Sequence, residues 1–119
     1  MWWVIALALS APAQAQRPFC DFGQGVAALR QAQHSLAAPI PGLVAGREAA
    51  QAIADSLDTA HTAFTRCGCW HLAEMLPEPA RMAESATSHS AVSQIRATLE
   101  NTALHINLAR QALDRRGCR

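Results

Sequence analysis

The chain has 119 residues, half of them hydrophobic, and a formal net charge of +1. This length suits one small domain. The near-neutral charge excludes the strong electrostatic field that recruits nucleic acid, so we expect no nucleic-acid partner. Only three Phe and three Trp are present and Tyr is absent. The core is therefore built mainly from small side chains, and covalent cross-links would be a useful supplement in a domain of this size.

The N-terminal residues 1–15 have the pattern of a cleaved signal peptide. Val4 to Ala11 is a short apolar run, and Ala13-Gln14-Ala15 is an A-x-A cleavage site. We expect a single helical domain over residues 16–119, a periplasmic or secreted location, and no stable membrane insertion after cleavage, because about 20 apolar residues are needed to span a bilayer. The leader lacks a basic residue before the apolar run, so either the true start lies upstream of Met1 or the leader is atypical.

Two amphipathic helices are predicted next. Asp21 is an acceptable N-cap for a helix that extends to about Ala38, and Pro39-Ile40-Pro41-Gly42 ends it. The second helix has the clearest helical periodicity, and Gly68 is predicted to cap its C-terminus. Its apolar positions are Ala50, Ile53, Leu57, Ala60, Phe64 and Cys67.

The third predicted helix runs from about Cys69 to Thr87 and contains two prolines. Proline has no backbone donor and clashes with the preceding turn, so we expect this helix to be kinked or broken near Pro77/Pro79, with Pro79 beginning the second piece.

A fourth helix is predicted from about Ser90 to Arg116, and Gly117 is expected to end it. The polar turn Thr87-Ser88-His89-Ser90 is expected to supply its N-cap. Leu104 and Leu108 widen the apolar face of this helix, which predicts that it is the most deeply buried of the four.

The four cysteines lie at corresponding positions of these helices. In an up-down bundle, the beginnings of the first and third helices and the ends of the second and fourth meet at one end. A bond between Cys67 and Cys69 would strain the disulfide geometry, so we expect each of Cys20 and Cys118 to pair with one of these two, in an order that the sequence leaves open. The predicted fold is an all-α, up-down four-helix bundle joined at one pole by two disulfides.

Nothing in the sequence predicts catalysis or a cofactor. Asp55 and Asp58 are three residues apart on one helix and are expected to face solvent. No nucleophile-elbow motif is present, and C-x-C is a poor substitute for the C-x-x-C of thioredoxin-type enzymes. We therefore expect a protein that is not an enzyme.

The end of the bundle that carries Cys20, Cys67, Cys69 and Cys118, here called the cysteine pole, gathers two candidate binding features. Trp70 either plugs the end of the bundle or is exposed as an anchor for a partner. Basic residues either complement the helix dipoles or form a patch for an acidic partner; they are Arg17, Arg66, Arg115, Arg116 and Arg119. The leading expectation is a monomer that binds another protein without catalysis, as an inhibitor, immunity or adaptor protein.

The alternative is a periplasmic metal-binding protein that uses Cys67, Cys69 and His71. Thiolates and imidazole are suitable ligands for Zn²⁺ or Cu(I), and these three residues follow one another as C-x-C-x-H. The exported location weighs against this alternative, because neighbouring thiols oxidise there.

Overall fold

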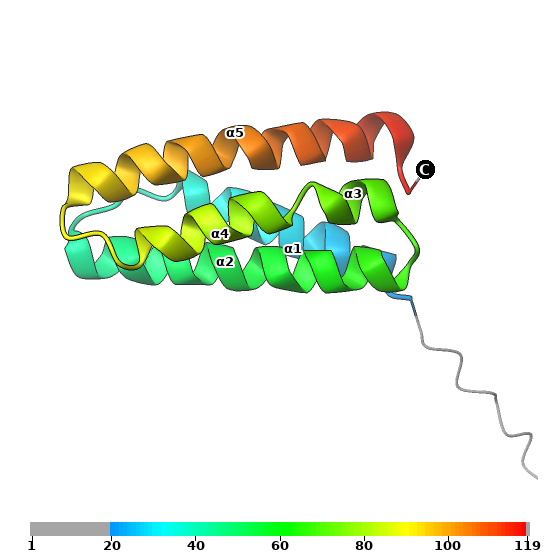
Figure 1. The fold of residues 1–119 in the computed structure, drawn as a ribbon, viewed down its shortest axis with the longest axis horizontal. Helices are drawn as coiled ribbons and strands as arrows, with labels where there is room; N and C mark the ends of the chain where they lie inside the picture. Colours follow the sequence, from blue (N-terminus) through cyan, green and yellow to red (C-terminus); the bar gives the residue numbers. More distant parts are fainter. Residues whose placement is uncertain (1–19, 119) are drawn as a thin grey trace, which may run out of the picture.

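The structure is a computed structural model that describes residues 20–118. The predicted signal peptide, its cleavage site, Arg17 and Arg119 lie outside the described residues. The described chain forms the helices α1 (Phe22–Ala37), α2 (Leu43–Arg66), α3 (Trp70–Glu74), α4 (Pro77–Ala86) and α5 (Val92–Arg116), and no strand occurs within this range. The helices α3 and α4 follow each other in the same direction and together take the place of the third helix of the bundle. The arrangement is therefore the predicted up-down bundle with a broken third helix (Figure 1).

The first helix packs tightly against α2. Its predicted N-cap is confirmed, since Asp21 Oδ1 accepts a hydrogen bond from the Gln24 backbone N–H at 3.0 Å. Phe64 of α2 is fully buried, and its ring centroid lies 5.5 Å from that of Phe22. A Cβ atom at Gly25 would lie 2.8 Å from Phe64 Cε1, so the absence of a side chain at this position allows the close approach of the two helices.

The most buried helix is α2, not the last helix as predicted. It packs against every other helix of the described chain. On α5, Leu104 and Leu108 are 63% and 54% exposed, whereas Ile95 and Ile106 are fully buried. At about 100° per residue, Leu104 lies roughly 200° around the helix from Ile106, so it faces away from the core. Leu104 therefore lies on the outer side of α5, and Leu108 lies at its flank, where it borders α3 but stays more than half exposed.

The break between α3 and α4 occurs at Met75 and Leu76. The expectation that Pro79 begins the second piece is wrong, because α4 begins at Pro77. Proline is well tolerated at this first helical position, where the missing N–H has no partner in the helix. The backbone N–H of Ala80 donates to the Leu76 carbonyl at 3.1 Å, and Pro79 is buried in the first turn.

The turn between α4 and α5 does not supply the predicted N-cap. The N-cap of α5 is Ala91, which makes no side-chain capping bond. Instead, Arg47 of α2 donates from Nε and Nη2 to the His89 carbonyl at 3.1 and 2.8 Å. His89 Nε2 lies 2.9 Å from Thr98 Oγ1. Side chains distant in sequence therefore hold this turn, which is why local pattern did not reveal its structure.

Two glycines end helices at the cysteine pole as predicted. Gly68 follows α2 with a φ of 71°, and Gly117 follows α5 with a φ of 58°. Residues with side chains seldom adopt these conformations. Both turns direct the chain toward the cysteines that follow them. The beginning of α1, the end of α2, the beginning of α3 and the end of α5 accordingly lie together at one end of the bundle (Figure 1).

Candidate functional site

Two disulfides join the four helix ends at the cysteine pole. They connect Cys20 to Cys67 and Cys69 to Cys118, each with a Cα–Cα distance of 4.8 Å. The prediction that both bonds run from a chain end to the central turn is confirmed, and the order that the sequence left open is now assigned. The left-handed turn at Gly68 separates Cys67, at the end of α2, from Cys69, whose side chain is buried in the core.

The disulfides bear directly on the metal-binding alternative. That alternative requires Cys67 and Cys69 as thiolates, and no cysteine within residues 20–118 is free. His71 is exposed on α3, and no group of three His, Cys, Asp or Glu side chains in this range is placed to hold a metal ion. The predicted set of three ligands is therefore not available in the oxidised chain.

Trp70 is the first residue of α3 and is 62% exposed. The interpretation in which Trp70 plugs the bundle is therefore wrong. The inward side of α3 is occupied by Leu72 and Ala73, and the buried Cys69 fills the adjoining part of the core. With the interior filled by these smaller side chains, the indole lies on the surface.

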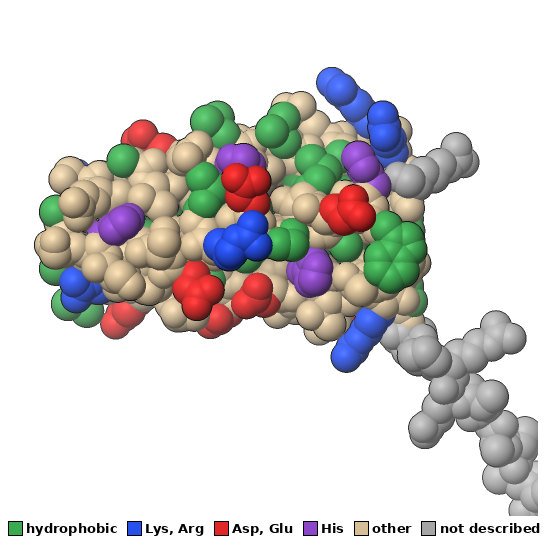
Figure 2. All heavy atoms as spheres, viewed as in Figure 1, with side chains coloured by type: hydrophobic (Ala, Val, Ile, Leu, Met, Phe, Trp, Pro, Cys, Tyr) green, Lys and Arg blue, Asp and Glu red, His purple; other side chains and the backbone are tan. Residues whose placement is uncertain are grey.

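Three arginines of the cysteine pole are exposed. Arg66 is the last residue of α2, and Arg115 and Arg116 are the last residues of α5. In the described part of the chain the only ion pair joins Arg110 Nε to an Asp114 carboxylate oxygen at 3.3 Å, so these three guanidinium groups have no carboxylate partner there. Figure 2 shows basic side chains projecting both above and below this end of the molecule.

A shallow groove lies between α3 and α5 next to the pole. Its apolar part is formed by Met75, Leu108 and Ala112, and its basic end by Arg115 and Arg116. His71 and Gln111 complete the lining. This groove can accept an apolar side chain beside a carboxylate. Sequence reasoning missed it because it placed Leu108 in the core.

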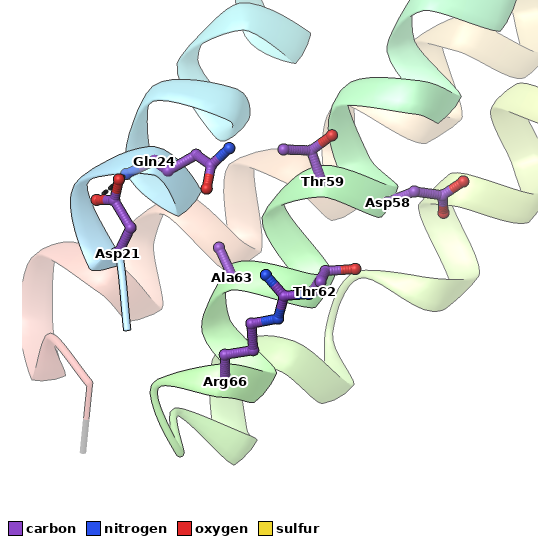
Figure 3. A pocket seen from close by; sticks show the side chains of 7 residues that line it. All are labelled: Asp21, Gln24, Asp58, Thr59, Thr62, Ala63 and Arg66. Carbon is purple, nitrogen blue, oxygen red and sulfur yellow. Dashed lines mark hydrogen bonds between the residues drawn. The ribbon is translucent and has the colours of Figure 1, made fainter. Parts of the chain in front are cut away.

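A second, polar pocket lies between α1 and α2 (Figure 3). Asp21 and Asp58 both line it, but the Asp21 carboxylate is turned to the Gln24 backbone and the Asp58 carboxylate points away from it. The two groups therefore do not form an acid–base pair. Asp58 is exposed, as is Asp55, which accepts a 2.8 Å hydrogen bond from Gln51 Nε2. Both have the solvent-facing position expected of them.

Comparison of the chain with models of known protein families, with curated proteins and with solved structures found no match. In residues 20–118, no helix combines the length and apolar character needed to cross a membrane. A helical bundle is compatible with many functions, so function is inferred from the surface of this chain alone.

Proposed function

We propose that this protein is exported to the periplasm or secreted and acts there without catalysis, by binding another protein through the cysteine pole. Its role would be that of an inhibitor, immunity or adaptor protein. The observation that carries the proposal is the 62% exposure of Trp70. Tryptophan is enriched among the few residues that dominate binding energy at interfaces.

The disulfides support this role because they hold the backbone around Trp70 in place. The residue before it, Cys69, is buried and bonded to Cys118 at the end of α5. On the other side of Gly68, the Cys20–Cys67 bond restrains the end of α2. A surface that is already ordered loses little conformational entropy on binding.

The charges of the pole favour an acidic partner. Arg66, Arg115 and Arg116 have no carboxylate partner within residues 20–118, and guanidinium groups bind carboxylates through paired hydrogen bonds. The groove between α3 and α5 adds an apolar site for a partner side chain next to these charges. The exported location is supported by the A-x-A site of the leader and by the two disulfides, which persist in oxidising compartments.

Affinity capture with tagged residues 16–119 from periplasmic extract tests the proposal. Trp70→Ala should weaken capture of the partner by more than about fivefold, the equivalent of roughly 1 kcal/mol. Val44→Ala is the matched control, because Val44 is 70% exposed near the start of α2, at the opposite end of the bundle. Equal capture by the wild type, Trp70→Ala and Val44→Ala, with the disulfides intact, would show that the cysteine pole is not the binding surface.

A further inference from the structure

The outer side of α5 carries a line of residues that stay exposed in the folded chain, two of which, Leu108 and Arg115, also line the groove against α3. Glu100, Leu104, Leu108 and Arg115 are all exposed, and within residues 20–118 the two leucines are among the four large hydrophobic residues that are exposed. At about 100° per residue these four positions fall within roughly 80° of one another on the helix surface. We call them the α5 ridge.

Charge changes sign along the α5 ridge. Glu100 lies at one end, Arg115 at the other, and the two leucines between them. The upper edge of the molecule in Figure 2, which is the outer side of α5 in Figure 1, shows the same order: acidic, then hydrophobic, then basic side chains. Neither Glu100 nor Arg115 forms an ion pair within residues 20–118.

The order of charges along the α5 ridge is complementary to that of a second copy of the ridge running in the opposite direction. Glu100 and Arg115 are 15 positions apart, about 22 Å along the helix axis at 1.5 Å per residue. In an antiparallel pair of α5 helices, Glu100 of each copy lies opposite Arg115 of the other. The symmetry axis then passes beside Leu108, and the leucines of both copies meet around it. A parallel pair would instead place like charges together.

We propose that the protein forms a twofold-symmetric homodimer through antiparallel packing of the α5 ridge. This replaces the expectation of a monomer. The ridge shares Leu108 and Arg115 with the groove between α3 and α5, so a second copy and a partner in that groove would compete for these two residues, whereas Trp70 and Arg66 lie outside the ridge. Isologous contact of the same patch on both subunits is the commonest form of self-association. A crossing angle of about 20°, usual for long helix pairs, keeps both charged ends within side-chain reach. Because the ridge is narrow, the dimer belongs among transient interfaces of small area.

Sedimentation equilibrium of disulfide-intact residues 16–119 tests this proposal. We expect reversible dimerisation, and loss of the dimer when Leu104 and Leu108 are both replaced by Ser. Both leucines are exposed, so the far-UV circular dichroism should be unchanged. Val44→Ser is the matched control and should dimerise as the wild type does. A wild-type chain that stays monomeric up to ~1 mM, where even a free energy of association of about 4 kcal/mol would be visible, would overturn the proposal.

Charge exchange tests the antiparallel register. Glu100→Arg and Arg115→Glu should each weaken self-association at least about tenfold, because each change turns two attractions into two repulsions. Mixing the two variants should restore dimers, since both pairs across the interface are then opposite in charge. Glu48→Arg, an exposed change on α2, should have no effect. Failure of the mixture to associate would overturn the proposed register.

Other occupants of the ridge have distinct signatures. Binding to phosphatidylglycerol vesicles is one such test. If the wild type is monomeric and binds these vesicles, and the variant with serine at both leucine positions does not bind them, the ridge contacts a membrane surface and the proposal is overturned. Self-association that survives both leucine substitutions would assign the dimer to another face and overturn it equally.

Discussion

Replacing Gly25 by Ala gives a sharp test of how α1 packs on α2. The new Cβ atom would lie 2.8, 3.0 and 3.1 Å from three atoms of the Phe64 ring. This ring is fully buried and packed against Phe22, so it has little room to move away. Overpacking of this kind costs about 1–3 kcal/mol. Against it stands a gain of about 0.5–1 kcal/mol, because alanine is the better helix former.

The matched control is Gly23→Ala in the same helix. Gly23 is exposed, and its added Cβ would meet only Asp21 Oδ1 at 3.4 Å, so this variant keeps most of the helix-forming gain without the clash. The difference in free energy of unfolding between the two variants should therefore be about 1–3 kcal/mol, with Gly25→Ala the less stable.

Urea and thermal unfolding with the disulfides intact measure this difference. For a domain of this size, 1 kcal/mol corresponds to about 4–8 °C in Tm. Phe64→Leu should couple to Gly25→Ala in a double-mutant cycle, because the smaller side chain relieves the clash. If Gly25→Ala is as stable as Gly23→Ala, α1 does not approach Phe64 as closely as the structure shows.

Further predictions concern the pole and the leader. Replacing both cysteines of either disulfide by serine should lower the free energy of unfolding by about 4 kcal/mol and Tm by about 15–30 °C, because the bonds close loops with sequence separations of 47 and 49; an unchanged Tm would mean that the bonds contribute no stability. Trp70→Ala should cost less than about 2 kcal/mol, against about 3–5 for Phe64→Ala, since only Phe64 is fully buried; equal losses in thermal unfolding would place Trp70 in the core. Charge reversal of Arg66 and Arg116 together should slow association with the captured partner and flatten its salt dependence, which stopped-flow kinetics can measure; rates equal to the wild type would exclude a steering role. The intact mass of the exported protein should correspond to a chain that begins at Gln16, and a full-length mass would refute cleavage after Ala15.

The helices and their approximate ends follow from local pattern. The spacing of Ile53, Leu57 and Phe64 identifies α2, and glycines identify the ends of α2 and α5 because only they adopt positive φ without strain. The proline-containing stretch predicts a break for an equally local reason. The local sequence pattern placed the start of α4 at Pro79 instead of Pro77. Both prolines fit the first turn of this helix, and which of them begins it depends on where α3 ends.

The candidate site depended far more on the tertiary structure. The sequence left Trp70 either buried or exposed. Its position depends on how the chain leaves the Gly68 turn and which side of α3 meets the core. Likewise, Leu104 and Leu108 extend the apolar face of α5 in the sequence, but burial requires a neighbour on that side. The neighbouring helices bury the side that carries Ile95 and Ile106 and leave Leu104 and Leu108 more than half exposed.

The sequence by itself determined that the chain is a helical bundle with both ends tied to the Cys67–Cys69 turn, because helix periodicity and the up-down order are properties of neighbouring residues along the chain. Only the tertiary structure decided that Cys20 bonds to Cys67 and Cys69 to Cys118. That choice depends on where α1 and α5 lie around α2, and on the direction in which one left-handed glycine turns the chain. These are relations between segments nearly 50 residues apart, which are fixed by packing of the whole core and not by any local pattern.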